Sequence, residues 1–145
     1  MTQKVYLDTS ALVKRYLKEE GTQVVDSHFE KCYDGDADLI ISQWNIGEAA
    51  VVFDKYQNRK VIRNAKKSFE LLYNEVSLLV KLGSFKIVPV MGEIIGSSIV
   101  LVFAHHIYIA DAIQIETCKQ AACQLFVTFD TKLDAIAEKE GLTIA

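Results

Sequence analysis

Short apolar or β-branched runs alternate along the chain with longer segments in which apolar residues recur every three or four positions. The short runs predict strands at residues 4–7, 39–42, 86–90, 125–128 and 142–144. The longer segments predict helices at residues 11–19, 22–33, 44–57, 61–82, 93–104, 112–123 and 131–139. This alternation is typical of an α/β protein, so we expect a three-layer α/β/α fold around a five-stranded, mostly parallel central sheet.

The segment 61–82 carries the clearest helical pattern. Its apolar residues follow alternating steps of three and four and form one stripe: Ile62, Ala65, Phe69, Leu72, Val76 and Leu79. Such a stripe predicts a helix face that packs against the protein core. A seam that pairs with a second chain is the alternative interpretation.

The chain of 145 residues has the length of one domain, residues 1–145, and about half of its residues are apolar. One proline and seven glycines leave no room for a long low-complexity tract. The net charge of -3 and the pI of about 5.6 exclude a general positive field that would attract nucleic acid. Any contact with a polyanion must therefore be local.

A local basic run contrasts with this acidic background. Residues 55–67 contain six basic residues and no acidic one. A solvated helix face is the usual meaning of such a run, but the run is also where a polyanion would find concentrated counter-charge. The candidate substrate-binding residues are Lys55, Arg59, Lys60 and Arg63.

The cysteines and the hydropathy of the chain indicate the cellular compartment in which we expect the protein. Cys32, Cys118 and Cys123 are odd in number and lack C-x-x-C spacing, and the first residues form no signal peptide. This pattern indicates reduced, buried thiols in a cytoplasmic protein. The segment 94–110 has no formal charge, but it is shorter than the roughly 20 apolar residues of a spanning helix, so we expect buried helices and no membrane contact.

Four acidic residues, hereafter the four acids, lie in or next to segments that follow predicted strands: Asp8, Glu48, Asp111 and Asp130. The carboxyl ends of parallel strands share one edge of a sheet, so the fold would gather these residues in one crevice. Each also has a simpler interpretation by itself. Asp8 and Asp130 suit helix N-caps, Asp111 with Gln114 fits a capping box, and Glu48 suits a helix surface.

Carboxylates that share a crevice need a counter-charge. Two of them about 4 Å apart repel by about 4 kcal/mol at an effective dielectric of 20, and no lysine or arginine lies within three residues of Glu48 or Asp111. Oxygen ligands without histidine or cysteine select Mg²⁺ or Mn²⁺ rather than zinc. We therefore expect one or two such ions, a water nucleophile activated near neutral pH, and phosphodiester hydrolysis.

Other motifs fail on inspection. The acidic turn 34–38 begins like a calcium loop but has Leu39 where the loop needs glycine. A D-x-D phosphatase motif is broken because Ser10 takes the place of the second acid, and a receiver-like phosphoacceptor would need an acidic pair at the end of the first strand. The adjacent His105 and His106 cannot easily share a metal from one helix face, so we interpret them as structural.

The segments VYLDTSALVKRY, WNIGEAA, HIYIADAIQIE and LFVTFDTKL resemble the four acidic motifs of PIN-domain ribonucleases, and especially of the VapC-type toxins of prokaryotic toxin-antitoxin pairs. The resemblance implies a five-stranded parallel sheet between helices, with the four acids as catalytic, metal-binding residues. It also implies that Ser10 and Thr128 orient the acids and the metal-bound water. The family cleaves single-stranded RNA, usually as a homodimer, and an antitoxin chain silences its toxin members.

The expected mechanism makes Asp8 and Asp111 direct ligands of Mg²⁺ or Mn²⁺. Glu48 and Asp130 act directly or through water, and one of them orients the attacking water. Two other functions remain open. A PIN-like protein could bind a cation and act through protein contacts without catalysis, although a pure scaffold has no reason to tolerate the repulsion. An RNA-processing nuclease without an antitoxin, acting on unstructured or structured RNA, would carry the same motifs.

Overall fold

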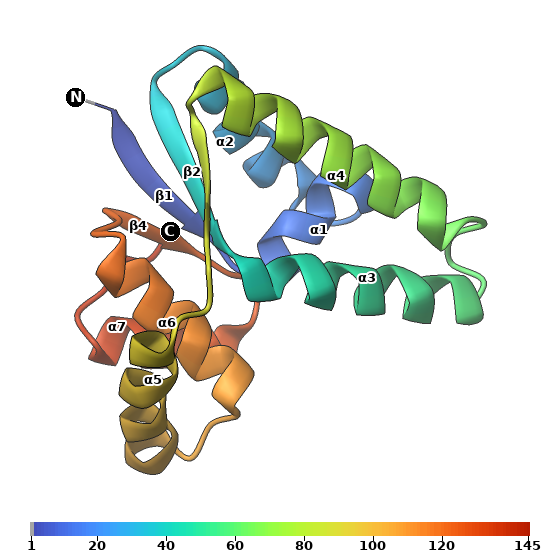
Figure 1. Cartoon of the computed structure of the whole chain (residues 1–145). Helices are drawn as coiled ribbons and strands as arrows, with labels where there is room; N and C mark the ends of the chain where they lie inside the picture. The colour runs from blue at the N-terminus through green and yellow to red at the C-terminus, as the bar shows by residue number, and fades with distance from the viewer. Residues whose placement is uncertain (1) are drawn as a thin grey trace.

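In a computed structural model, which describes residues 2–145, the chain forms a parallel sheet with helices on both faces (Figure 1). The strands are β1 (Gln3–Leu7), β2 (Ala37–Ser42), β3 (Phe85–Val88) and β4 (Leu125–Val127). The helices are α1 (Thr9–Leu17), α2 (Thr22–Tyr33), α3 (Gln43–Asn58), α4 (Ala65–Leu82), α5 (Gly92–His105), α6 (Ile109–Gln120) and α7 (Thr131–Lys139).

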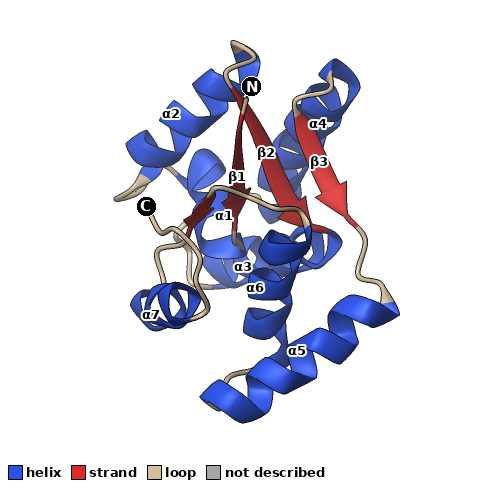
Figure 2. Ribbon diagram, turned by 90° about the vertical axis from the view of Figure 1, so that its left-hand side faces the viewer, coloured by secondary structure: helices blue, strands red, loops and turns tan. Residues whose placement is uncertain are grey.

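The strand order is β3-β2-β1-β4, and all three pairings are parallel. Val5 lies opposite Leu39 on one side and Leu125 on the other. In Figure 2 the arrowheads of β1, β2 and β3 point toward the same end of the molecule. The prediction of a parallel central sheet is confirmed, and the carboxyl ends of the strands share one edge.

Side chains that alternate along the strands build a separate core on each face of the sheet. Val5 and Leu7 are buried in a cluster with residues of α1, α2, α3 and α4. Tyr6, between them, is buried in a second cluster with residues of α5, α6 and α7, where its ring stacks on Phe126 at 5.4 Å between centroids. This period of two, with helices over both faces, confirms the three-layer α/β/α fold.

The predicted fifth strand at residues 142–144 is wrong. Only Ile144 forms an isolated parallel bridge, with Phe126. The N–H of Leu142 donates instead to the carbonyl of Ala137 and closes the end of α7. Gly141, with a left-handed φ of 85°, and Leu142 still belong to the C-terminal cap of α7, so only Thr143 and Ala145 exchange hydrogen bonds with Phe126. The sheet therefore has four strands within the described residues.

The predicted helix at residues 61–82 begins too early. Lys60 has a left-handed φ of 60°, which ends the turn after α3, and residues 61–64 form a bend. Asn64 then caps α4 by accepting a hydrogen bond from the N–H of Lys67. The basic run therefore covers the end of α3, a connecting turn and the start of α4, rather than one helix face.

The apolar stripe of α4 faces the core as predicted. Leu72, Val76 and Leu79 are buried and contribute to the cluster under α1, α2 and α3. The alternative of a pairing seam on this stripe is wrong, because the same side chains are already covered by the protein itself.

Three other boundaries, in β3 and α6, also differ from the prediction. β3 ends at Val88 rather than at residue 90, since Pro89 has no N–H to donate to the ladder. α6 begins at Ile109, three residues before the predicted start, which places Asp111 inside its first turn. It ends at Gln120 rather than at residue 123, because Ala122 has a left-handed φ of 55°.

His105 and the three cysteines, which the sequence indicates to be structural, lie at buried or half-buried positions. His105 lies 2.7 Å from Glu140, and Cys32 and Cys118 are buried free thiols, while Cys123 is half-buried. No single helix within residues 2–145 is long and apolar enough to cross a membrane. Helices α5 and α6 reach that length only together, with a bend of 120° between them.

Candidate active site

The four acids line one cavity at the carboxyl edge of the sheet. The cavity has a volume of about 130 Å³, and its other lining residues are Thr9, Ser10, Gln114 and Leu133. Asp8 follows β1, Glu48 lies in the second turn of α3 after β2, and Asp130 follows β4. Asp111 comes from the first turn of α6, on the other face of the sheet. No cationic side chain is among the lining residues.

Asp8 is the most deeply buried of the four acids, with 4% of its surface exposed. Its Oδ1 accepts hydrogen bonds from Ser10 Oγ at 2.7 Å and from the N–H of Ala11 at 2.9 Å. Its Oδ2 accepts from Thr128 Oγ1 at 2.5 Å. Burial raises the pKa of Asp8 to about 6, and the charge of Asp130 adds to this increase, although the three hydrogen bonds oppose it.

Asp8 is therefore an N-cap of α1, as the simpler interpretation predicted, but it is not only a cap. The cap uses one oxygen, and two hydroxyl groups from separate chain segments hold the carboxylate as well. A cap by itself needs no burial of the charge, since its partner is a single backbone N–H.

Thr128 joins the loop after β4 to Asp8. Its hydroxyl donates to Asp8 and accepts from the N–H of Asp130 at 3.0 Å, and Ser10 Oγ similarly accepts from the N–H of Phe129 at 2.9 Å. The two hydroxyls thus fix the position of Asp130 relative to Asp8. Asp130 caps α7 through Oδ1 alone, which leaves Oδ2 without a donor among residues 2–145.

Glu48 is held from one side only. Its Oε1 accepts from Thr9 Oγ1 at 2.7 Å and from Gln114 Nε2 at 3.0 Å, whereas no described residue donates to its Oε2. The interpretation of Glu48 as a solvated helix residue is wrong, because it is half-buried and anchored to two other elements. Its second oxygen is available to a ligand.

A buried polar network, which the sequence reasoning missed, holds Gln114 in place. Gln114 Oε1 accepts from Tyr6 OH at 2.5 Å and from Asn45 Nδ2 at 2.8 Å, and Asn45 Nδ2 also lies 2.9 Å from Thr9 Oγ1. Tyr6 and Asn45 have no exposed surface, and Gln114 is 2% exposed. These residues connect β1, α3 and α6 directly beneath Glu48.

The sequence held a partial signal for this network. Gln114 was assigned to a capping box with Asp111, and that assignment is wrong because α6 begins before Asp111 and is not capped by a side chain. The capping box lies at the start of α3 instead, between Ser42 and Asn45. The sequence signal for the network is that Asn45 and Gln114 each lie three residues from an acid and next to apolar positions.

Asp111 lies close to two of the other acids, Asp130 and Glu48. Burial first, and then the charges of Asp130 and Glu48, raise the pKa of Asp111. None of the capping or hydroxyl contacts that hold Asp8 and Asp130 is made by Asp111 within the described chain. Its carboxylate is therefore half-buried and close to other acids, and the charge of Lys132 offsets their effect on its pKa only in part.

The donor set fits a hard divalent cation, but the described residues do not form a closed chelate. Within residues 2–145 no three acid, histidine or cysteine side chains lie close enough together to hold an ion in this geometry. The chemistry of the cavity nevertheless matches Mg²⁺ or Mn²⁺, because its ligands are carboxylate and hydroxyl oxygens. The pKa values of Asp8 and Asp111 are raised mainly by burial and further by neighbouring acids, and a bound cation would oppose both effects.

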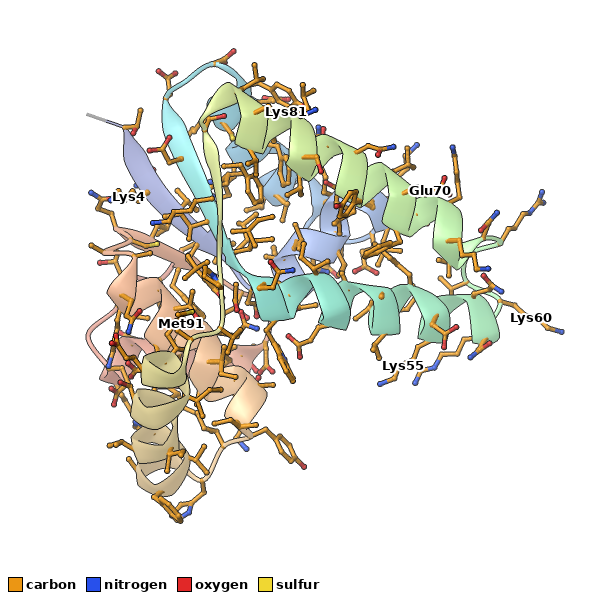
Figure 3. All side chains as sticks on the ribbon, viewed as in Figure 1. Lys4, Lys55, Lys60, Glu70, Lys81 and Met91 are labelled. Carbon is orange, nitrogen blue, oxygen red and sulfur yellow. The ribbon has the colours of Figure 1, made fainter. Side chains whose placement is uncertain are left out.

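The four basic candidates lie outside this cavity. Lys55, Arg59, Lys60 and Arg63 are exposed at the far end of α3 and in the turn that follows, and Figure 3 shows Lys55 and Lys60 extending into solvent there. At 1.5 Å per residue, Lys55 is about 10 Å along the helix from Glu48. The structure thus separates the basic run from the acids, although Lys55 and Glu48 both lie on α3.

The sequence pattern of the PIN domain matches residues 5–139, and the chain belongs to this family. The fold is similar to that of PAE2754 from Pyrobaculum aerophilum, with a TM-score of 0.67 at 18% identity over 99% of this chain and 90% of that one. The fold is also similar to that of VapBC2 from Rickettsia felis, bound to a DNA fragment from its promoter. That structure has a TM-score of 0.62 at 13% identity over 99% of this chain and 98% of that one.

A third similar structure is VapC20 of Mycobacterium tuberculosis, described as a sarcin-ricin loop cleaving toxin. It gives a TM-score of 0.59 at 13% identity over 90% of this chain and 93% of that one. None of the curated proteins matches the chain in sequence. At these identities the similarity concerns the fold, and it confirms the predicted PIN resemblance.

Proposed function

We propose that the protein is a metal-dependent endoribonuclease that hydrolyses phosphodiester bonds of single-stranded RNA, and that it is the toxin of a toxin-antitoxin pair. One observation carries the proposal: four carboxylates from four separate segments line one cavity without a cationic side chain among them. Keeping such a cluster costs stability unless it binds a cation. Membership of the PIN domain family supports the nuclease class.

The four acids would hold Mg²⁺ or Mn²⁺, some directly and some through water. When bound, the ion supplies charge neutralisation at a phosphoryl oxygen and makes a water molecule more acidic. Ser10 and Thr128 keep the Asp8 carboxylate in one orientation. The oxygens Glu48 Oε2 and Asp130 Oδ2 have no donor among residues 2–145, and one of them would accept a hydrogen bond from the attacking water.

Two protein partners belong to the same proposal. A second copy of the chain would cover the exposed apolar face of α5, where Ile99, Val100 and Phe103 are 46%, 66% and 77% exposed. An antitoxin would cover the hollows between α3 and α4, one of about 310 Å³ that includes Tyr73 and Val80. Similar folds occur in toxin-antitoxin complexes of Klebsiella pneumoniae and Rickettsia felis.

Asp111→Asn tests the proposed catalysis. The substitution keeps the size of the side chain and removes one charge, so metal-dependent cleavage of a single-stranded RNA pool should fall by roughly 100-fold or more. Glu116→Gln is the matched control, because Glu116 lies on the same helix, pairs with Lys119 at 3.6 Å and does not line the cavity.

Cleavage should require Mg²⁺ or Mn²⁺ and should stop on chelation. Equal cleavage by wild type and Asp111→Asn would assign the activity to a contaminant or to another site. Metal binding without any RNA cleavage would favour the non-catalytic PIN-like protein instead.

A further inference from the structure

The chain has one tryptophan, and it lies on the exposed face of α3 beside the acids. Trp44 is 43% exposed. The backbone N–H of Trp44 donates to Ser42 Oγ at 3.1 Å in the capping box that joins β2 to α3. The indole therefore projects from a rigid helix start rather than from a loop. A wide aromatic surface is left in water one helical turn before Glu48.

Trp44 borders a hollow that adjoins the acid cavity. The hollow has a volume of about 320 Å³ and is lined by Gln43, Trp44, Gly47, Glu48 and Val51, most of it apolar. Ligand pockets commonly start at about 300 Å³. Glu48 lines both the hollow and the acid cavity, so the two lie against the same side chain.

Gly47 keeps this hollow open. A Cβ at this position would meet no atom within 4 Å, so the glycine is not required by packing. Glycine inside a helix costs about 1 kcal/mol relative to alanine. Its effect here is to leave free the surface between Trp44 and Val51.

The same face of α3 continues to the basic residues. Trp44, Glu48, Val51 and Lys55 recur at steps of three and four, which places them on one side of the helix. In Figure 3 Lys55 leaves α3 on the side away from α4. Along α3 this face thus offers, in order, the ring of Trp44, the carboxylate of Glu48, the apolar Val51 and the positive charge of Lys55, about 10 Å beyond Glu48.

We infer that the hollow binds an unpaired nucleobase of the RNA, stacked on the indole of Trp44, next to the phosphate that reaches the acids. This inference rests on the proposed ribonuclease function and adds a base-binding subsite to it. Single-stranded RNA presents both a flat π face and flanking phosphates, which match the aromatic hollow and Lys55. Paired bases in a duplex have no free face for the indole, so the subsite selects single strands.

The single tryptophan gives a direct measurement. In EDTA, where the proposed cleavage stops, a short single-stranded RNA should quench the fluorescence of Trp44 as it binds. An abasic ribose-phosphate oligomer of equal length carries the same charge without bases, and it should bind more weakly and leave the fluorescence unchanged. A duplex of the same sequence should also fail to quench.

Two substitutions should weaken RNA binding by different means. Trp44→Leu removes the ring, and we expect about 5- to 150-fold weaker binding of labelled RNA, the range for loss of one base-aromatic stack. Trp44→Phe should recover part of this loss. Gly47→Leu fills the hollow and should weaken binding while keeping or raising the melting temperature, which separates lost binding from misfolding.

Tyr33→Leu is the matched control for loss of an exposed aromatic ring. Tyr33 is 44% exposed at the end of α2, which precedes β2 and so lies at the opposite edge of the sheet from the acids. RNA binding by this variant should equal that of wild type.

The outcomes distinguish the subsite from the ribonuclease proposal. If wild type cleaves RNA but Trp44→Leu and Gly47→Leu bind it equally well, or if the abasic oligomer quenches as RNA does, the base-binding subsite is overturned and the nuclease stands. If both variants keep RNA affinity but lose self-association or antitoxin binding, the hollow is a protein interface. If wild type neither binds nor cleaves RNA, the proposed function itself fails.

Discussion

Replacing Asp8 by asparagine should stabilise the metal-free protein at neutral pH, because the substitution removes a buried carboxylate charge. Asparagine caps a helix about as well as aspartate, so the bond from the N–H of Ala11 is retained. The new amide N–H₂ can donate to Thr128 Oγ1, and the Thr128 hydroxyl can turn toward Ser10 Oγ, which lies 3.3 Å away. This rearrangement keeps partners for the hydroxyls of Ser10 and Thr128 and uses one N–H of the new amide.

The magnitude follows from the two pKa values of the Asp8 carboxyl. It is about 3.8 in the unfolded chain and about 6 in the folded protein. The folded protein therefore holds the proton about a hundredfold more tightly, which corresponds to about 3 kcal/mol. Below pH 3.8 the carboxyl is protonated in both states, and this contribution to stability is fully present. It is lost as the pH rises toward and through 6.

The advantage of Asp8→Asn over wild type should grow by about 2 kcal/mol between pH 4.5 and pH 8, as calculated from these two pKa values. Urea unfolding in EDTA at several pH values measures it. Asp34→Asn, an exposed acid after α2, is the control and should show no such growth. Adding Mg²⁺ or Mn²⁺ should reduce the advantage of Asp8→Asn. A metal concentration of about 100 times the dissociation constant would stabilise wild type by about 2.7 kcal/mol.

A constant difference between the two proteins at all pH values would refute the reasoning, because the charge of Asp8 would then cost nothing on folding. A difference in stability that grows with pH but does not change on addition of metal would confirm the buried charge. It would also contradict a cation site shared by the four acids.

Two further predictions concern the edges of the site. Changing Arg59, Lys60 and Arg63 together to glutamate should weaken RNA binding and lower the slope of log affinity against log salt by about 2, with metal affinity unchanged. An unchanged slope would mean that the basic run is only a solvated surface. Gln114→Leu should destabilise the protein by about 1–3 kcal/mol in urea unfolding, because Tyr6 loses its closest acceptor in a buried position. It should also lower the rate of RNA cleavage, and a fully active variant would show that the network does not position Glu48.

The layers of the fold could be predicted because buried positions recur at regular intervals along strands and helices and are filled by apolar residues. Val5, Tyr6 and Leu7 are all apolar in character, which is typical of a strand covered on both faces, and they do point to two different cores. The edges of elements depended on single hydrogen bonds that no period reveals. One example is the N–H of Leu142, which donates to Ala137 at the end of α7. Another is the early start of α6, at Ile109.

The positions of the four acids around one cavity follow from parallel topology, and sequence reasoning could anticipate them. Their support could not be anticipated in the same way. Gln114 and Asn45 are polar residues that meet only when β1, α3 and α6 are packed together, with partners 69 positions apart in the chain. Local patterns instead favoured a nearby partner for Gln114, and that local interpretation failed.

The hydroxyl of Thr128 joins residues that are 120 positions apart, and this has a consequence for biosynthesis. A ribosome releases β1, α3 and α6 before β4, so three of the four acids can fold while Asp130 and the Thr128 hydroxyl are still absent. The carboxylate of Asp8 receives that donor only when β4 adds to the edge of the sheet beside β1. A nascent chain therefore carries an incomplete acid cluster until β4 has been made, and a product truncated before residue 125 should lack the proposed ribonuclease activity.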